Sequence, residues 1–406
     1  MPVLFDGHLD LAMNALLYER DVTLPVAALR KRERQPNPDD RGVATVSLPE
    51  LRRCGVAVAV ATLIARTKPW VDPARRIGRM DLDYPEASMA YAAAQGQLAY
   101  YRLLEARREL RIITDAAALN EHFEQATRIA PATPATPAAA GATTVQAGAV
   151  DHPGQRSLAG PASATPDPPQ PGIILLMEGA DPIVEPAQIH QWHAQGLRAL
   201  ALAHYGHSRY AAGTPSPDPA SHEQDGPLTP LGHELLREAR ELPLAIDLSH
   251  LSDQSFYQVV DAWPGRLCAS HTNCRALVPN QRQFTDEQIK LIIEREGVVG
   301  VVTYAGMIRP LARDGGRAAD VRLAQLVEHI DHVCQIAGSA RHVGLGSDLD
   351  GGFGAEATPA ELNDYADLLK LEPLLRERGF DDQDVAGFFH ANWRRFYHDV
   401  LSGQQA

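Results

Sequence analysis

The sequence contains no apolar run that approaches the ~20 residues needed to cross a bilayer, and residues 1–6 lack the basic and then apolar segments of a signal peptide. Positive charge is scarce, because 38 Lys and Arg stand against 51 Asp and Glu, a net charge of −13. The four cysteines form no CxxC pair. These absences argue against a membrane protein and against a nucleic-acid or anionic-membrane partner. We therefore expect a cytoplasmic protein with reduced, structural cysteines.

The length of 406 residues suits one catalytic domain, and 45% hydrophobic with 22% charged residues is ordinary globular composition. One segment stands apart. Residues 130–172 are rich in Ala, Pro, Thr and Gly and have no apolar period, which predicts a low-complexity, flexible insertion within the domain spanning 1–406.

Short apolar runs alternate with helical patterns along the chain, which is typical of parallel βα units. Thr285 and Gln288 form a predicted capping box, and residues 321–337 carry a helical apolar stripe closed by Gly338. Eight such units favour a (β/α)8 TIM barrel of the metal-dependent hydrolase type, although a doubly wound sheet stays open from pattern alone. The eight runs are Val3–Phe5, Val56–Ile64, Ile173–Met177, Ala199–Ala203, Leu244–Leu248, Leu267–Ala269, Val298–Val302 and Val343–Leu345.

Polar side chains follow most of these runs, at the face where barrel enzymes carry their catalytic groups. The second and seventh runs offer no such group. A lone histidine there is usually a hydrogen-bonded loop residue, and an aspartate often caps the next helix. Independent accidents, however, explain poorly why the other six runs all end in metal-capable or ionisable side chains, within Asp6–Asp10, at Glu178, at His204, within Asp247–His250, within Ser270–His271 and within Ser347–Asp350.

The spacing of these groups suggests a pair of cations. His8 and Asp10 are two residues apart, so both side chains point to one side of an extended chain and can grip one ion. His250 and His271 can grip a second ion, and Glu178 can bridge the two through its two oxygens. Imidazole and carboxylate ligands suit zinc. Two such ions activate a shared water and polarise a carbonyl.

A proton carrier completes such a site, and Asp348 is the obvious carboxylate. The residue pattern by itself therefore predicts a two-metal hydrolase.

The ordered motifs resemble those of the membrane (renal) dipeptidase family, peptidase family M19, in a bacterial-type form without an anchor. The resemblance covers most of the chain, in the right order, and leaves out the 130–172 insertion. Because several motifs agree in sequence order, it is far more specific than any single H-x-D pair. The motifs that carry it are Asp6–Asp10, Met177–Gly179, Gly226–Pro230, Ile246–His250, Ala269–Ala276 and Gly344–Gly352.

The resemblance implies an amidohydrolase-type barrel with two Zn²⁺ ions. Carried over by motif, His8, Asp10 and Glu178 would hold one zinc, while Glu178, His250 and His271 would hold the other. The implied reaction is hydrolysis of the peptide bond of a small dipeptide by a metal-bridging hydroxide, with Glu178 as a catalytic bridge.

Three further residues would contact the substrate. By resemblance, His204 steadies the oxyanion, Arg282 binds the terminal carboxylate, and Asp348 contacts the substrate amine and the attacking water. Where the family usually has Asn, this chain has Leu9, and we expect this side chain to face away from the metals. The loop 205–210 also departs from the mammalian members, which bears on substrate preference.

Other functions stay open at this point. A deacylase or cyclic-amide hydrolase would keep the barrel and metals and change the bond. A catalytically silent binding module would require a degraded site, and a phosphoesterase would need a basic cluster at the strand ends. A homodimer is implied only by the resemblance.

Overall fold

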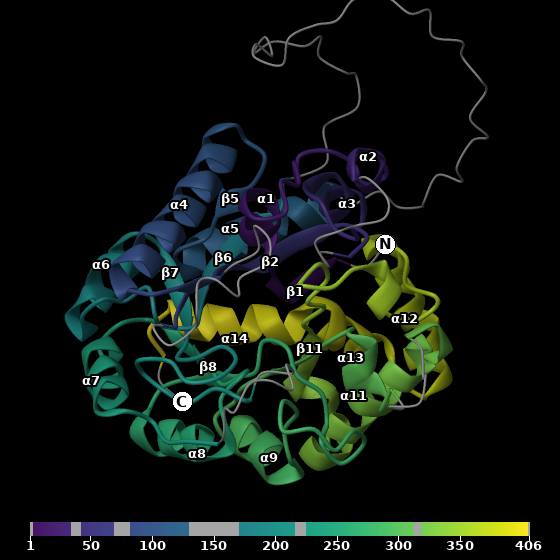
Figure 1. The fold of residues 1–406 in the computed structure, drawn as a ribbon. Coiled ribbons are helices and arrows are strands. Elements are labelled where there is room, and N and C mark those ends of the chain that lie inside the picture. Colours follow the sequence, from purple (N-terminus) through teal and green to yellow (C-terminus); the bar gives the residue numbers. More distant parts are fainter. Residues whose placement is uncertain are drawn as a thin grey trace, which may run out of the picture.

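The computed structural model describes residues 3–33, 42–68, 82–129, 170–215, 225–311 and 318–404. Parallel strands curl into a barrel at its centre (Figure 1), in the order β1-β2-β6-β7-β8-β9. A bridge between Ala269 and Val299 continues this order to β10, which pairs with β11. The eight strands are β1 (Leu4–Leu9), β2 (Val56–Leu63), β6 (Gly172–Glu178), β7 (Leu197–Ala201), β8 (Ala245–Asp247), β9 (Leu267–Cys268), β10 (Val299–Val301) and β11 (Val343–Leu345).

The ring closes between the last strand and the first. Beyond β11, the Asp348 amide donates to the His8 carbonyl at 3.2 Å, and the Ser347 amide donates to Asp6 Oδ1 at 2.8 Å. This closure confirms the predicted barrel and excludes the doubly wound alternative. All eight predicted runs are strands. Three short strands were not predicted, namely β3 (Arg66–Thr67), β4 (Asp83–Tyr84) and β5 (Arg111–Ile112).

Helices surround the strands (Figure 1). The predicted capping box at Thr285 is present, and Gly338 ends α11 with a left-handed φ of 67°, as its missing Cβ allows. Among the described helices, none combines the length and the apolar content needed to span a membrane. Their bounds are α1 (Leu11–Leu16), α2 (Val26–Arg32), α3 (Leu48–Arg53), α4 (Ala87–Ala106), α5 (Ala116–Ile129), α6 (Ile189–Ala194), α7 (Pro230–Ala239), α8 (Asp253–Ala262), α9 (Asp286–Glu294), α10 (Ala305–Ile308), α11 (Leu323–Ala337), α12 (Leu371–Glu377), α13 (Asp382–Ala386) and α14 (Asn392–Leu401).

The predicted insertion, residues 130–172, falls largely outside the described residues, which resume at Gln170. Helix α5 ends just before it, and β6 begins at its last residue, Gly172, which the structure therefore assigns to a strand. The barrel strands therefore form on both sides of this segment.

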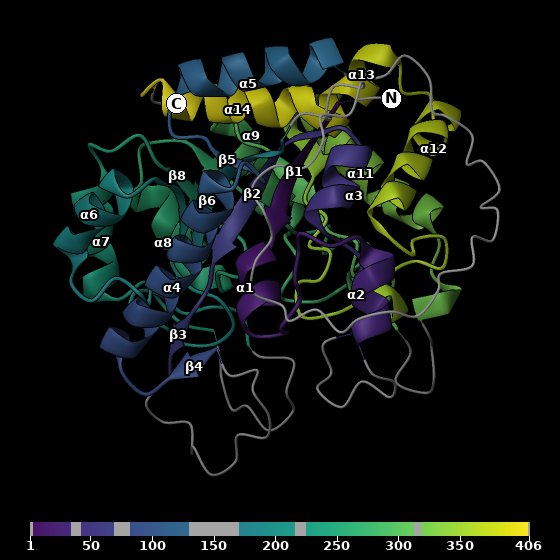
Figure 2. The same cartoon turned by 90° about the horizontal axis from the view of Figure 1, so that it is seen from above.

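One end of the barrel is sealed by α5 and α14, which lie side by side in Figure 2. The Trp393 indole is fully buried and donates to the Leu345 carbonyl at 2.8 Å, and the Phe5 and Tyr397 rings stack at 5.6 Å. Because Asn392 also bonds the carbonyl of Val343, where β11 starts, this aromatic plug fills the end at which the strands begin. The opposite end, at the carboxyl ends of the strands, is where barrel enzymes carry their active sites.

The plug predicts a sensitive glycine. A Cβ on Gly344 would lie 2.6 Å from Nε1 of the buried Trp393. Gly344→Ala should therefore lower the free energy of unfolding by about 1–3 kcal/mol through overpacking. Gly96→Ala is the matched control, since a Cβ there meets no atom within 4 Å, and the helical site should gain up to about 1 kcal/mol. Denaturant unfolding measures both; equal stability of the two variants would contradict the plug.

Candidate metal centre

The five predicted metal ligands meet at the carboxyl ends of the strands. His8 lies in β1 and Asp10 follows it, Glu178 is the last residue of β6, and His250 and His271 follow β8 and β9. All five are buried, with exposed fractions between 0% and 4%. Four strands thus bring residues from distant parts of the sequence to one place.

Glu178 stands at the centre of this group. Its Oε2 lies 3.5 Å from His8 Nε2, while its Oε1 lies 3.3 Å from His250 Nε2 and 3.5 Å from His271 Nε2. Asp10 Oδ1 is 3.8 Å from His8 Nε2. The possible ligand atoms form three overlapping groups, each within 4.8 Å, namely His8, Glu178 and His271; Glu178, His204 and His250; and His8, Asp10 and Asp348.

Two of these atoms lack a hydrogen-bond partner among the described residues, which fits a site for cations. His8 Nε2 and Glu178 Oε2 are buried without a hydrogen-bond partner among the described residues. His250 Nε2 and His271 Nε2 face each other at 2.9 Å. Buried polar atoms are normally paired, because leaving one unpaired costs about 1–3 kcal/mol. Coordination of a cation by these imidazole and carboxylate atoms would satisfy them together.

The electrostatics of the site also favour positive charge. Burial opposes the charged form of His8, yet Glu178, Asp10 and Asp348 together raise the pKa of His8 to about 10. Burial, with the repulsion of Glu178, raises the pKa of Asp10 to about 7. Burial likewise raises the pKa of Asp348 well above its usual range. Three carboxyl groups surround one imidazole, and the raised pKa values show that this site favours bound protons. A metal cation could supply the same positive charge.

The two histidines on the other side of Glu178 are poised as neutral ligands. Burial, followed by the Arg282 charge, lowers the pKa of His250 to about 3. Burial and the His8 charge lower the pKa of His271 well below its usual range. A neutral imidazole has the lone pair that a metal ion needs.

A serine fixes which nitrogen of two histidines faces the centre. Ser270 Oγ lies 3.1 Å from His8 Nδ1 and 2.8 Å from His271 Nδ1. The hydroxyl donates its own hydrogen to the Asp247 carboxylate, so it accepts from both Nδ1–H groups. Nε2 of both rings therefore points toward Glu178, and each ring in its neutral form has its lone pair there. The serine and aspartate were visible at the strand ends, but their role depends on contacts between strands.

The three predicted substrate residues lie at the edge of this cluster. The side chains of His204 and Asp348 are 13% and 14% exposed, more than those of the five metal residues. Asp348 and His250 both have left-handed backbones, with φ of 56° and 66°. Such conformations are costly for residues with a Cβ and concentrate at functional sites.

Arg282 is buried, and only part of its guanidinium group forms hydrogen bonds. Its Nη2 donates to the His271 carbonyl at 2.9 Å, whereas Nε and Nη1 have no hydrogen-bond partner within the described ranges. An anionic group would pair with them. Leu9 is fully buried in the hydrophobic core, which confirms that it faces away from the cluster.

The second strand and the residues that follow it supply groups that the sequence did not reveal. The Thr62 hydroxyl donates to Asp10, and Arg66 Nη1 lies 3.0 Å from His204 Nδ1. Lys68 Nζ donates to the carbonyls of Tyr205 and His207, in the loop that follows His204. The second run itself ends without a metal-capable or ionisable group, and these supporting residues contact the site only across strands.

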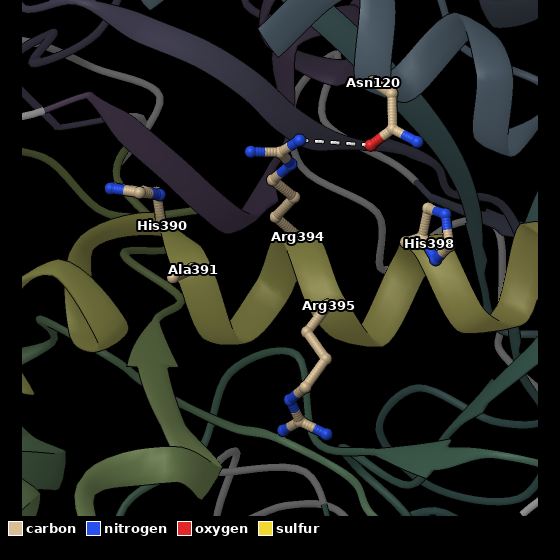
Figure 3. A pocket seen from close by; sticks show the side chains of 6 residues that line it. All are labelled: Asn120, His390, Ala391, Arg394, Arg395 and His398. Atoms are coloured by element: carbon tan, nitrogen blue, oxygen red, sulfur yellow. Dashed lines mark hydrogen bonds between the residues drawn. The ribbon is translucent and has the colours of Figure 1, made fainter. Parts of the chain in front are cut away.

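A separate hollow of about 320 Å³ lies at the far end of the barrel, between α5 and α14. Figure 3 shows Arg394 and Arg395 pointing to different sides of α14. Arg394 bonds Asn120, and Arg395 pairs with Glu296. The two guanidinium groups point away from each other and each has a partner. This hollow therefore does not bring charged side chains together as a binding site would.

Known proteins match this chain in both sequence and structure. The family model "Membrane dipeptidase (Peptidase family M19)" matches residues 164–404, more than half of the chain. The chain belongs to peptidase family M19. The match contains Glu178, His204, His250, His271, Arg282 and Asp348. His8 and Asp10 precede it, and the barrel brings them to the same cluster.

Relatives of this M19 chain include an uncharacterized protein of Klebsiella pneumoniae, 32% identical over 56% of this chain and 82% of that protein. An uncharacterized dipeptidase of Schizosaccharomyces pombe is 28% identical over 55% of this chain and 52% of its own length. The chain thus spans about half the length of this named dipeptidase. A solved metallopeptidase from Rhodobacter sphaeroides has a TM-score of 0.70 at 23% identity, covering 98% of this chain and 100% of that one, and supports the fold.

The serine contacts generate a prediction for metal binding. Ser270→Ala removes the acceptor that orients His8 and His271, and loss of such a partner typically costs about 10–100-fold in metal affinity. Competition with a chelator measures this affinity for zinc. Ser255→Ala is the matched control, because this buried serine bonds Gly226 and Ala212 and, among the described residues, makes no hydrogen bond to the ligand histidines. Unchanged zinc affinity in Ser270→Ala would exclude the orienting role.

Proposed function

We propose that this chain hydrolyses the peptide bond of dipeptides at a centre of two zinc ions. The observation that carries the proposal is the convergence of His8, Asp10, Glu178, His250 and His271. Within this cluster, His8 Nε2 and Glu178 Oε2 have no hydrogen-bond partner among the described residues. Membership of a metal-dependent family of peptide-bond hydrolases supports it.

The two oxygens of Glu178 suggest how the ligands divide. Oε2 faces His8, near Asp10, and Oε1 faces His250 and His271. We assign His8 and Asp10 to one zinc, His250 and His271 to the other, and Glu178 to both. When bound, such a pair of cations polarises a carbonyl and lowers the pKa of a water molecule. Imidazole and carboxylate ligands favour zinc.

Asp348 is the residue that we assign to proton movement. Its Oδ1 lies 3.9 Å from His8 Nε2, and burial raises the pKa of its carboxyl group well above its usual range. A carboxyl group with a raised pKa can take a proton from water and return it to the leaving amine. Its greater exposure lets it meet the substrate amine as well.

Arg282 sets the substrate class in this proposal. Its free Nε and Nη1 suit a carboxylate, which pairs with guanidinium through parallel hydrogen bonds. A terminal carboxylate held at a fixed distance from the cations selects short substrates. The Rhodobacter sphaeroides metallopeptidase was solved with a phosphinate mimic of the dipeptide L-Ala-D-Ala, which supports dipeptides as the class to test first.

His204 completes the assignment as the donor to the carbonyl oxygen. Burial and the neighbouring His250 lower the pKa of His204 well below its usual range, so its ring is neutral. A preorganised donor at the developing oxyanion stabilises the transition state.

Removal of one ligand tests the metal proposal. His250→Ala should abolish hydrolysis of a dipeptide panel and lower the bound zinc, while unfolding changes modestly because the fold rests on the strands and the plug. His190→Ala is the control, a half-exposed histidine paired with Glu238 on the surface. A His250→Ala enzyme that keeps most of its chelator-sensitive rate would refute the assignment. Activity on N-acyl amino acids alone would favour a deacylase.

The role of Arg282 needs a substrate comparison. Arg282→Met should reduce kcat/KM for dipeptides by about 100-fold, as loss of one partner of a buried charge pair typically does. Dipeptide amides, which lack the carboxylate, should be poor substrates of the native enzyme and little affected by the change. An equal loss on both substrates would show that Arg282 acts on the fold or the metals instead.

A further inference from the structure

The position of His204 leaves two roles open. Its Nε2 lies 3.8 Å from Glu178 Oε1, and it belongs to one of the possible ligand groups together with Glu178 and His250. A metal ligand needs a lone pair on Nε2, whereas a donor to a substrate oxygen needs a hydrogen there. The location of one proton therefore separates the two roles.

Arg66 decides where that proton lies. Its Nη1 is 3.0 Å from His204 Nδ1. A guanidinium group has only donors and stays charged in proteins. His204 Nδ1 must therefore accept, so the hydrogen of the neutral ring is on Nε2.

We propose that Arg66 is a positioning residue, which holds His204 as an Nε2–H donor and keeps it out of the metal ligand set. This inference rests on the proposed hydrolysis for its catalytic consequence. The Nε2–H of His204 would then donate to the substrate carbonyl oxygen as negative charge develops.

Arg66 is itself held in place on both sides. It lies in β3, where it pairs with Asp83 of β4, and Arg66 Nε donates to Asp83 Oδ1 at 2.5 Å. The next residue, Thr67, donates its amide to Asp181 at 2.9 Å. Asp181 also accepts from the Arg209 amide at 3.0 Å, in the loop that follows His204. The guanidinium group and the histidine loop are thus tied to one another through the backbone.

The contrast with the ligand histidines supports the same conclusion. Nδ1 of His8 and of His271 faces the Ser270 oxygen, which accepts, so the neutral form of each of these rings has its lone pair on Nε2. Nδ1 of His204 faces a donor, Arg66, so its ring presents a hydrogen. The group that contacts Nδ1 therefore decides whether Nε2 of a histidine can bind a metal ion or donate a hydrogen bond.

The test observes the proton directly. In zinc-loaded protein with ¹⁵N-labelled histidine, His204 should show an Nε2–H signal, assigned by its loss in His204→Gln. Arg66→Met keeps an apolar stem and removes the donor, so this signal should shift or disappear. The variant should lose about 100-fold or more in kcat for a dipeptide, with KM nearly unchanged, as loss of an oxyanion donor predicts. Arg66→Lys should restore part of both.

Lys68→Met is the matched control, because Lys68 holds the same loop through the carbonyls of Tyr205 and His207. It should leave the His204 signal in place. An Nδ1–H signal in the native protein, or an unchanged spectrum and kcat in Arg66→Met, would overturn the proposal. If Arg66→Met does not fold, the native spectrum and Arg66→Lys still decide. Native protein that shows the Nε2–H signal but cleaves no dipeptide would refute the proposed function and leave the role of Arg66 standing.

Discussion

The structure depends on a concentration of buried negative charge at one end of a closed barrel. Asp10, Glu178 and Asp348 converge on His8, and together they raise the pKa of His8 to about 10. Isolated buried charges are too costly to persist without a partner. Protons can supply part of the positive charge, as the raised pKa values of His8, Asp10 and Asp348 indicate. Divalent cations would supply the missing charge, and most of the remaining geometry acts to hold their ligands.

The barrel holds those ligands through side chains that link neighbouring strands beyond their last backbone pairs. Asp247 accepts from Ser249 and Ser270 and so ties β8 to β9. Asp6 accepts from the amides of His8 and Ser347 and so ties β1 to β11. In each case a carboxylate just before a predicted ligand fixes the chain that carries it. The same hydrogen bonds therefore join neighbouring strands and orient the predicted ligands. Loss of one of them would affect both the end of the barrel and the position of a ligand.

Local patterns in the sequence predicted what local forces determine. Apolar runs became strands, and strand ends located His8, Glu178, His250 and His271, because side-chain direction and strand polarity follow from chain geometry. Arg66 could not be placed in this way. It lies beyond the end of β2, and its contact with His204 depends on pairing between β3 and β4, which are separated by residues without a readable pattern.

The predicted ligands and the residues around them lie on different kinds of element, strands and loops. The ligands lie within or next to strands, where a shift of one residue would turn a side chain to the other face. Tyr205 and Arg282 lie on loops, whereas Arg66 lies in the short strand β3, outside the barrel. Loops generally tolerate change better than the strands that they join. The loop after His204 is joined to the ligand set, because the Thr214 amide donates to the His250 carbonyl at 2.6 Å, so a change in this loop bears on both the substrate and the ligands.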